Sequence, residues 1–162
     1  KEVAEEVTDY SPERYLAPNP IKTQIKFNQL PWTEKQKRFI ELSLDKNTRL
    51  ILCKCPAGSS KTLTAVYSAL QLLNNSKVSD VIYMRSAVES SDSRLGFLPG
   101  DADEKLHYYN LPFMDKLDEL LSEETVKKLQ KEKRVSIHPV NFARGMSWNS
   151  KAILLDLSLI HI

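Results

Sequence analysis

The chain has 162 residues, of which 23 are Lys or Arg and 21 are Asp or Glu, so its formal net charge is +2. This length suits one domain, and a hydrophobic content of 41% is ordinary for a soluble protein with a buried core. The even charge balance argues against a strongly basic DNA-coating protein. No apolar run approaches the roughly 18 residues of a membrane span, and the first residues lack the apolar segment of a signal peptide. We expect no membrane partner and a cytoplasmic location, in the host cell if the sequence is viral.

Residues 1–21 are charged, contain three prolines and show little periodicity, which predicts a flexible arm or linker. A helix should begin near Thr33, because Thr33 can cap its start and Gln36 completes a capping box three residues later. The apolar face of this helix is formed by Phe39, Ile40 and Leu44. The chain starts at Lys1 instead of Met, and we expect a fragment of a longer reading frame.

A short apolar run over 50–53, bounded by Pro56 and Gly58, predicts a buried strand. It ends at Cys53, two positions before Cys55, the other cysteine of the chain. On a strand the two side chains would share a face, but a disulfide between them would close a tight ring, and the spacing is too short for a zinc site. We therefore expect both to be small apolar strand residues in a reducing compartment.

Strands and helices alternate along the rest of the chain. The expected elements are a helix from Lys61, a strand at 81–84, helices at 112–121 and 122–133, and strands at 135–137 and 152–156. Pro112 suits the first turn of its helix, and residues 85–100 are turn-rich, which predicts a long surface loop. This order predicts an α/β fold with a mostly parallel sheet and flanking helices, whose ligands bind at the carboxyl ends of the strands.

The segment from Cys55 to Thr62 lies between an expected strand and an expected helix, where a phosphate-binding loop belongs. The loop itself would be formed by Pro56, Ala57, Gly58, Ser59 and Ser60. In such a loop the backbone N–H groups and the helix N-terminus face the anion, Lys61 reaches the β- and γ-phosphates, and the Thr62 hydroxyl holds Mg²⁺. Cys55 and Ser60 replace the two usual glycines, so Ser60 must accept backbone angles that Gly adopts freely. The alternative is a plain helix cap with Ser60 as the N-cap.

Asp156 ends the last apolar strand. A P-loop nucleoside triphosphatase needs a carboxylate at the end of a neighbouring strand to help hold Mg²⁺. The alternative is a strand-end Asp that begins a turn. The next residue, Leu157, cannot position or activate a water molecule for hydrolysis.

Further segments follow the loop in a recognisable order. They are Arg85-Ser-Ala-Val-Glu89, Leu95-Gly-Phe-Leu-Pro-Gly-Asp101, Glu104-Lys105, Pro139, Arg144-Gly145 and Ile153-Leu-Leu-Asp156. Over roughly 29–156, this order and spacing resemble the PhoH-like ATPases, P-loop proteins related to the helicase- and RecA-type nucleotide-binding core. The Ser59-Ser60 form of the loop is more similar to the bacteriophage branch of that family.

The resemblance implies a P-loop NTPase domain over 22–156 that binds Mg-ATP and, in the full-length protein, hydrolyses it. It implies catalytic roles for Lys61 and Asp156, with Thr62 and Asp156 on the metal. Gln36 takes the place of an adenine-reading glutamine, with the capping box as the alternative. The family also implies a phosphate-starvation response and a link to RNA metabolism. RNA and a second copy of the chain stay open as partners, and the alternative function is a nucleotide- or RNA-binding module without ATP turnover.

Two departures from the family follow Asp156. Leu157 stands where the family has a catalytic Glu, and the later family positions are absent, so we expect a domain truncated at its C-terminus. Residues 157–162 resemble the translation of a transposase adapter used to prepare sequencing libraries. We treat them as a doubtful tail.

Other charged residues have more ordinary explanations. Asp101, Asp103 and Glu104 suit a turn and the first turn of a helix better than a metal site. A basic stretch, better explained as a solvated helix face than as an RNA contact, consists of Lys127, Lys128, Lys131, Lys133 and Arg134. Arg85 and Arg144 are candidates for phosphate contacts or for structural pairing with a carboxylate.

Overall fold

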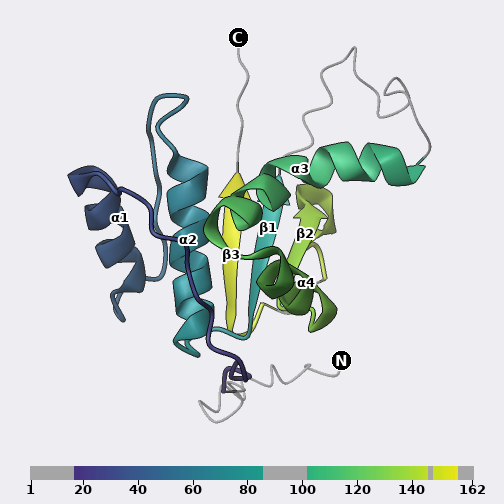
Figure 1. Ribbon diagram of the computed structural model, residues 1–162, viewed down its shortest axis with the longest axis horizontal. Coiled ribbons are helices and arrows are strands. Elements are labelled where there is room, and N and C mark those ends of the chain that lie inside the picture. The colour runs from purple at the N-terminus through teal and green to yellow at the C-terminus, as the bar shows by residue number, and fades with distance from the viewer. Residues whose placement is uncertain (1–16, 86–101, 146–147, 157–162) are drawn as a thin grey trace, which may run out of the picture.

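The computed structural model describes residues 17–85, 102–145 and 148–156 (Figure 1). Three expectations therefore fall wholly or largely outside the described residues. They concern the arm over 1–21, the surface loop that follows Arg85, and the doubtful tail over 157–162. Among the described helices, none combines the length and apolarity needed to cross a bilayer.

Three parallel strands form the described sheet, in the order β2-β1-β3. β1 spans Asp80–Arg85, β2 spans Val135–Pro139 and β3 spans Lys151–Asp156. The prediction of a mostly parallel sheet with flanking helices is confirmed. Because all three strands point the same way, their carboxyl ends meet at one edge, where Arg85 is the register partner of both Pro139 and Asp156.

In the described part of the chain, four α-helices and one short 3₁₀ helix accompany this sheet. They are α1 (Glu34–Leu44), α2 (Lys61–Asn74), α3 (Ala102–Leu120), α4 (Glu123–Lys131) and η3 (Val140–Ala143). In Figure 1, α2, α4 and the second half of α3 lie over one face of the sheet, and α1 lies outside α2. α1 begins as predicted, since Thr33 and Gln36 form the capping box.

The core lies between these helices and one face of the sheet. Its fully buried members include Leu70 of α2, Tyr83 of β1, Phe113 of α3 and Leu129 of α4. The Tyr83 and Phe113 rings stack with their centroids 4.7 Å apart. Each fully buried Leu or Phe contributes about 1.5–3 kcal/mol relative to an exposed one, so this single apolar layer holds α2, α3 and α4 on the strands.

The opposite face of the sheet is apolar but only partly covered. Side chains alternate along a strand, so Ile82 and Met84 point away from the face that α2 covers, as do Ile153 and Leu155. Ile153 and Leu155 are 43% and 52% exposed. The described helices therefore cover one face of the sheet more fully than the other.

The predicted buried strand over 50–53 is wrong. In the structure these residues form no strand, and Leu50 and Leu52 are 77% and 87% exposed. An extended segment becomes a strand only when a neighbour accepts and donates its ladder hydrogen bonds. None of the three described strands pairs with this segment. For the same reason Cys53 and Cys55 are exposed instead of being packed strand residues.

The start of α3 also differs from the prediction. The helix begins at Ala102, so Pro112 lies inside it and not in its first turn. Pro removes one backbone hydrogen bond from a helix interior, and here tertiary packing outweighs that loss, with Phe113 and Leu117 fully buried directly after it. The expectation that the acids near residue 101 mark a helix start is confirmed by the position of Ala102.

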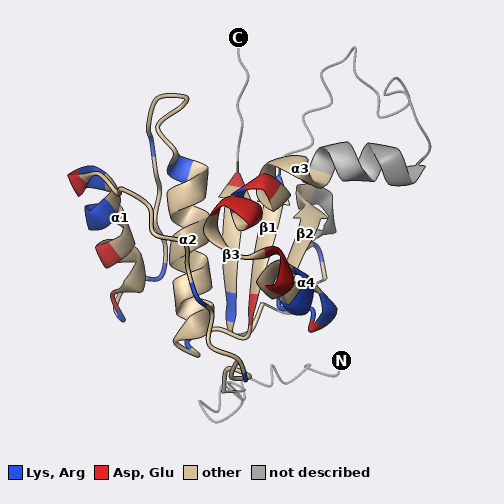
Figure 2. Cartoon of the chain, in the orientation of Figure 1, with Lys and Arg blue, Asp and Glu red and all other residues tan. Residues whose placement is uncertain are grey.

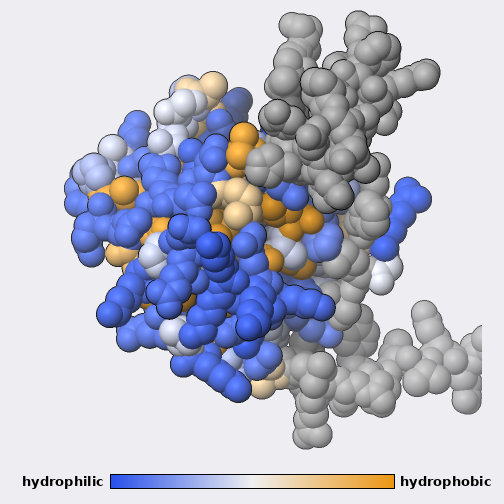
Figure 3. All heavy atoms as spheres, turned by 45° about the vertical axis from the view of Figure 1, so that its right-hand side comes forward, coloured by the Kyte–Doolittle hydropathy of each residue, from blue (hydrophilic) through white to orange (hydrophobic). Residues whose placement is uncertain are grey.

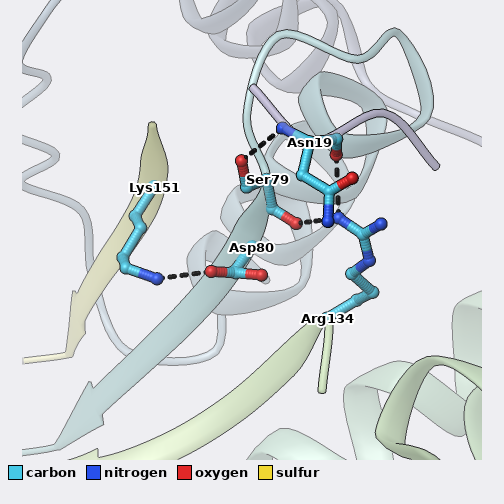
Figure 4. A network of polar contacts seen from close by, with 5 residues as sticks. All are labelled: Asn19, Ser79, Asp80, Arg134 and Lys151. Atoms are coloured by element: carbon cyan, nitrogen blue, oxygen red, sulfur yellow. Dashed lines mark hydrogen bonds and ion pairs between the residues drawn. The ribbon is translucent and has the colours of Figure 1, made fainter. Parts of the chain in front are cut away.

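An extended segment over 17–30 lies across α2, α3 and α4. The Ile25 N–H donates to Asn74 Oδ1 over 2.7 Å, and the Asn28 N–H donates to the Leu120 carbonyl over 2.8 Å. Arg134 is buried and donates to the carbonyls of Asn19 and Ser79, both over 2.8 Å, as Figure 4 shows. The segment is therefore tied to the domain by a side chain, that of Arg134, near its start and by a backbone hydrogen bond near its end.

Candidate functional site at the carboxyl edge of the sheet

The turn before α2 contains two residues with left-handed backbone angles. Gly58 has φ +77°, and Ser60, which is not a glycine, has φ +56°. Both angles lie in the left-handed region, so Ser60 does adopt the glycine-like conformation that its place in the loop requires. The turn is closed by the Ser59 hydroxyl, which donates to the Pro56 carbonyl over 2.8 Å.

The start of α2 is not capped by a side chain. Ser60 occupies the N-cap position, but its hydroxyl makes no capping hydrogen bond. The first N–H groups of a helix have no partner within the helix and carry the positive end of its dipole. This end of α2 therefore suits an anion better than it suits the plain Ser60 cap that was the alternative.

Lys61 folds back over the loop. Its Nζ lies 3.5 Å from the Cys55 carbonyl and 3.4 Å from the Pro56 carbonyl. These long contacts are made by an ammonium group on a flexible stem, which exchanges partners easily. A phosphate above the loop would offer this ammonium a charged partner in place of two carbonyls.

Thr62 and Asp156 meet although they are far apart in the sequence. The Thr62 hydroxyl, in the first turn of α2, donates to Asp156 Oδ2 over 3.3 Å. Figure 2 shows a basic residue at the start of α2 and an acidic residue at the tip of β3, both at the same edge of the sheet. The structure thus brings together the hydroxyl and the carboxylate that the sequence places in the metal site.

Tyr83 is a site residue that sequence reasoning missed. Its hydroxyl donates to the same Asp156 Oδ2 over 2.6 Å, while its ring is buried in the core. The role of Tyr83 could have been predicted from its position in β1, because the register of β1 and β3 places its side chain on the same face of the sheet as that of Asp156. Tyr83 therefore orients the Asp156 carboxylate from beneath.

These groups suit Mg²⁺ only as part of a shared site. Magnesium takes oxygen ligands and is usually held by one or two carboxylates together with substrate phosphates. Thr62 and Asp156 supply two such oxygens, and the described residues contain no cluster of three or more His, Cys, Asp or Glu that could hold a metal alone. The donor set therefore fits a magnesium ion that arrives with a phosphate ligand.

Gln36 is engaged elsewhere. Its Oε1 accepts a hydrogen bond from the Thr33 N–H over 2.8 Å, and its own N–H donates to Thr33 Oγ1 over 3.3 Å. The capping alternative therefore describes its contacts in this structure. To read adenine, the Gln36 amide would first have to leave its cap.

The remaining candidates are spread over the molecule. Arg85 lies at the end of β1 beside Asp156, whereas Arg144 is exposed after η3. The side chains of Asp101, Asp103 and Glu104 lie outside the described part of the chain. Arg85 is thus the only one of these two arginines that the sheet register brings to the candidate site.

The basic stretch divides into surface lysines and one buried arginine. Lys127 pairs with Glu123, and Lys128 donates to the Thr23 hydroxyl. Arg134 is buried and holds backbone carbonyls, including that of Ser79 just before β1. The stretch therefore lies toward the amino ends of the strands, opposite Asp156. In the view of Figure 3, the lower part of the visible surface is mostly hydrophilic.

The two cysteines lie directly before the loop. Both are free and exposed, and their Sγ atoms are 3.5 Å apart. Partial burial raises the pKa of the Cys53 thiol, the hydrogen bond with Cys55 raises it further, and the charge of Lys61 opposes both effects.

Together these features describe an α/β protein with an uncapped helix start and a strand-end carboxylate at one edge of a parallel sheet. Comparison with known proteins agrees with this class. The family model described as PhoH-like protein matches residues 30–158, and the chain belongs to that family.

Curated bacterial proteins are similar over most of the chain. A PhoH-like protein of Mycobacterium tuberculosis is 36% identical over 126 residues, which is 78% of this chain and 35% of the relative. A PhoH-like protein of Bacillus subtilis is 35% identical over 111 residues, or 68% of this chain and 34% of the relative. Protein PhoH of Escherichia coli is 29% identical over 113 residues. The chain thus spans about a third of the length of the curated relatives it matches.

Proposed function

We propose that this chain binds Mg-ATP at the carboxyl edge of its sheet, as a P-loop domain of the helicase- and RecA-like type. The observation that carries the proposal is the contact between Thr62 and Asp156, because it joins the start of α2 to the end of β3. In this arrangement Pro56, Ala57, Gly58, Ser59 and Ser60 surround the phosphates. Lys61 stabilises their negative charge, and Gln36 is at most a secondary contact for adenine.

Each residue then has a distinct part in binding. Lys61 leaves the carbonyls of Cys55 and Pro56 and moves to the phosphate oxygens. Thr62 and Asp156 hold the metal, and Tyr83 keeps the carboxylate in one orientation. Bound Mg²⁺ would neutralise charge on the phosphates. No side chain is assigned to water activation, because Leu157 follows Asp156.

The experiment is a calorimetric titration of Mg-ATP into the chain and into Lys61→Ala. We expect Lys61→Ala to weaken binding at least tenfold, about 1.4 kcal/mol, because it removes the charge nearest the loop. Lys77→Ala is the matched control, since Lys77 is an exposed lysine beyond the other end of α2. Equal affinity of the wild type and Lys61→Ala would exclude this binding site.

For the longer protein we propose hydrolysis of ATP, coupled to RNA metabolism. The family supports this proposal, and a native Leu157 would favour a second candidate, a nucleotide- or RNA-binding module without turnover. Phosphate release by the longer protein, with and without RNA, separates the two. Release that depends on ATP supports the enzyme, and binding without release supports the module.

The biological setting is a further part of the proposal. The Ser59-Ser60 form of the loop supports an origin in the bacteriophage branch, and the name of the Escherichia coli relative supports a link with phosphate starvation. Sequencing the source DNA beyond the Asp156 codon tests whether the tail is native. A Glu codon there would restore the catalytic position, and a genuine Leu would favour the binding module.

A further inference from the structure

Two thiols lie side by side directly before the proposed phosphate loop. Cys53 and Cys55 are both exposed, and their sulfur atoms are 3.5 Å apart across the single intervening residue, Lys54. A protein disulfide has an S–S bond of about 2.0 Å, so the two sulfur atoms are close but must approach further, within a tight ring, before they can bond.

The backbone that carries these thiols also holds Lys61. The Cys55 carbonyl lies 3.5 Å from Lys61 Nζ, and the neighbouring Pro56 carbonyl lies 3.4 Å from it. A bond between the two sulfurs would close a ring that contains the backbone from the Cys53 Cα to the Cys55 Cα, so it would restrict the torsion angles of Lys54 and the φ angle of Cys55. It would also stiffen the chain directly before the turn at Gly58, which must adapt to a phosphate.

We propose that Cys53 and Cys55 form a reversible dithiol–disulfide switch that lowers nucleotide affinity when it is oxidised. The inference rests on the proposed function of the adjoining loop. The oxidant is a peroxide. One thiolate attacks one peroxide oxygen and becomes a sulfenic acid, while the O–O bond breaks and the other oxygen leaves as hydroxide, which is protonated to water. The second thiolate then displaces hydroxide from that sulfur, which leaves as a second water. Two thiols thus lose two electrons and two protons to one hydrogen peroxide, which becomes two waters.

The tight ring favours a reversible disulfide over a permanent structural one. A disulfide that spans one residue departs from relaxed geometry, and strained, exposed disulfides are the easily reduced and regulatory ones. In a reducing compartment such a bond forms only transiently. Since the thiolate is the nucleophile, and burial raises the pKa of Cys53, oxidation should accelerate as the pH rises through the thiol range.

The first test asks only whether the disulfide forms. The chain is treated with one equivalent of hydrogen peroxide, its remaining thiols are alkylated, and its mass is measured. We expect one intramolecular disulfide between Cys53 and Cys55, no alkylation, and full reversal by dithiothreitol. Two alkylated thiols, a disulfide between two chains, or a sulfinic acid would overturn the proposal.

The second test measures the effect on binding. Mg-ATP is titrated into the reduced, the oxidised and the re-reduced chain, with Cys53→Ser as the control that cannot form the bond. We expect at least a tenfold loss of affinity on oxidation, recovery on reduction, and no response in Cys53→Ser. A disulfide without a change in affinity overturns the switch. If the reduced chain does not bind Mg-ATP, the proposed function is wrong, and so is the proposed control of nucleotide binding. The mass measurement would still show separately whether the disulfide forms.

Discussion

At the scale of single residues, Asp156 depends on its neighbours for its position. Two hydroxyls, those of Tyr83 and Thr62, donate to the same carboxylate oxygen, over 2.6 Å and 3.3 Å. Tyr83 comes from the core and Thr62 from the helix that follows the loop. A metal held by both Thr62 and Asp156 would replace the hydrogen bond between them, while Tyr83 would continue to hold the carboxylate in place.

Tyr83→Phe tests this positioning role. The variant keeps the ring that stacks on Phe113 but removes the hydrogen bond to Asp156, so we expect a loss of about 1 kcal/mol in the free energy of unfolding. We also expect several-fold weaker binding of Mg-ATP, measured by calorimetry. Tyr67→Phe is the control, because its hydroxyl accepts a bond from Gln71 instead. Equal losses of ATP affinity in the two variants would contradict a specific role for Tyr83.

At the scale of elements, Gln36 at the start of α1 has two interpretations, as a helix cap and as an adenine contact. Gln36 and Thr33 bond reciprocally at the start of the helix, and α1 contains no buried residue. The helix therefore depends strongly on its cap. The Gln36 side-chain amide would bind the Thr33 backbone if Gln36 caps the helix, and it would bind the adenine base if Gln36 reads the nucleotide.

The variants Thr33→Ala and Gln36→Ala separate these interpretations. Loss of either half of the capping box should cost about 0.5–2 kcal/mol of helix stability, and faster hydrogen exchange of the first-turn amides would report it. If Gln36 only caps the helix, the two variants bind ATP alike. If it also reads adenine, Gln36→Ala loses affinity for ATP relative to GTP, and Thr33→Ala does not.

At the scale of the whole molecule, the segment over 17–30 joins elements that are distant in sequence. Arg134 is central to this, because its guanidinium donates to the carbonyls of Asn19, Pro20 and Ser79. Beside it, Lys151 pairs with Asp80 and links the starts of β3 and β1. Figure 4 shows this group of polar contacts, which lies at the amino ends of the strands, away from the proposed nucleotide site.

Arg134→Ala should destabilise the fold without a direct effect on the site. It leaves three carbonyls without their donor; one hydrogen bond to a charged group contributes about 1.5–3 kcal/mol, and bonds that share one side chain contribute less than their sum. We expect a loss of about 2–4 kcal/mol in the free energy of unfolding, measured with urea. Lys131→Ala, an exposed change nearby, should lose less than about 0.5 kcal/mol. A similarly small loss for Arg134→Ala would show that the segment over 17–30 is not held by this residue.

Much of the fold follows from local patterns. Periodicity predicts α2, α4 and the three paired strands, and the capping box predicts the start of α1. The strand expected over 50–53 fails because pairing depends on a partner and not on the apolar run itself. The start of α3 is predicted too late because Pro112 lies inside the helix, where the packing of Phe113 outweighs the hydrogen bond that Pro112 removes.

Some residues of the candidate site can likewise be predicted from the sequence, and others cannot. Lys61, Thr62 and Asp156 follow from motif and context, since parallel strands and the following helix bring their ends to one edge of a sheet. Tyr83 and the buried Arg134 do not follow, because their roles depend on contacts between elements far apart in the sequence. The proximity of the two thiols likewise depends on the conformation of the chain before the loop.

The most direct test of the proposed site is the magnesium dependence of ATP binding in the wild type and in Asp156→Asn. We predict that Mg²⁺ strengthens ATP binding at least tenfold in the wild type and that Asp156→Asn loses most of this gain, while Asp118→Asn, an exposed change on α3, keeps it. The same magnesium gain in the wild type and Asp156→Asn would contradict the assignment of the Thr62 and Asp156 pair to the metal.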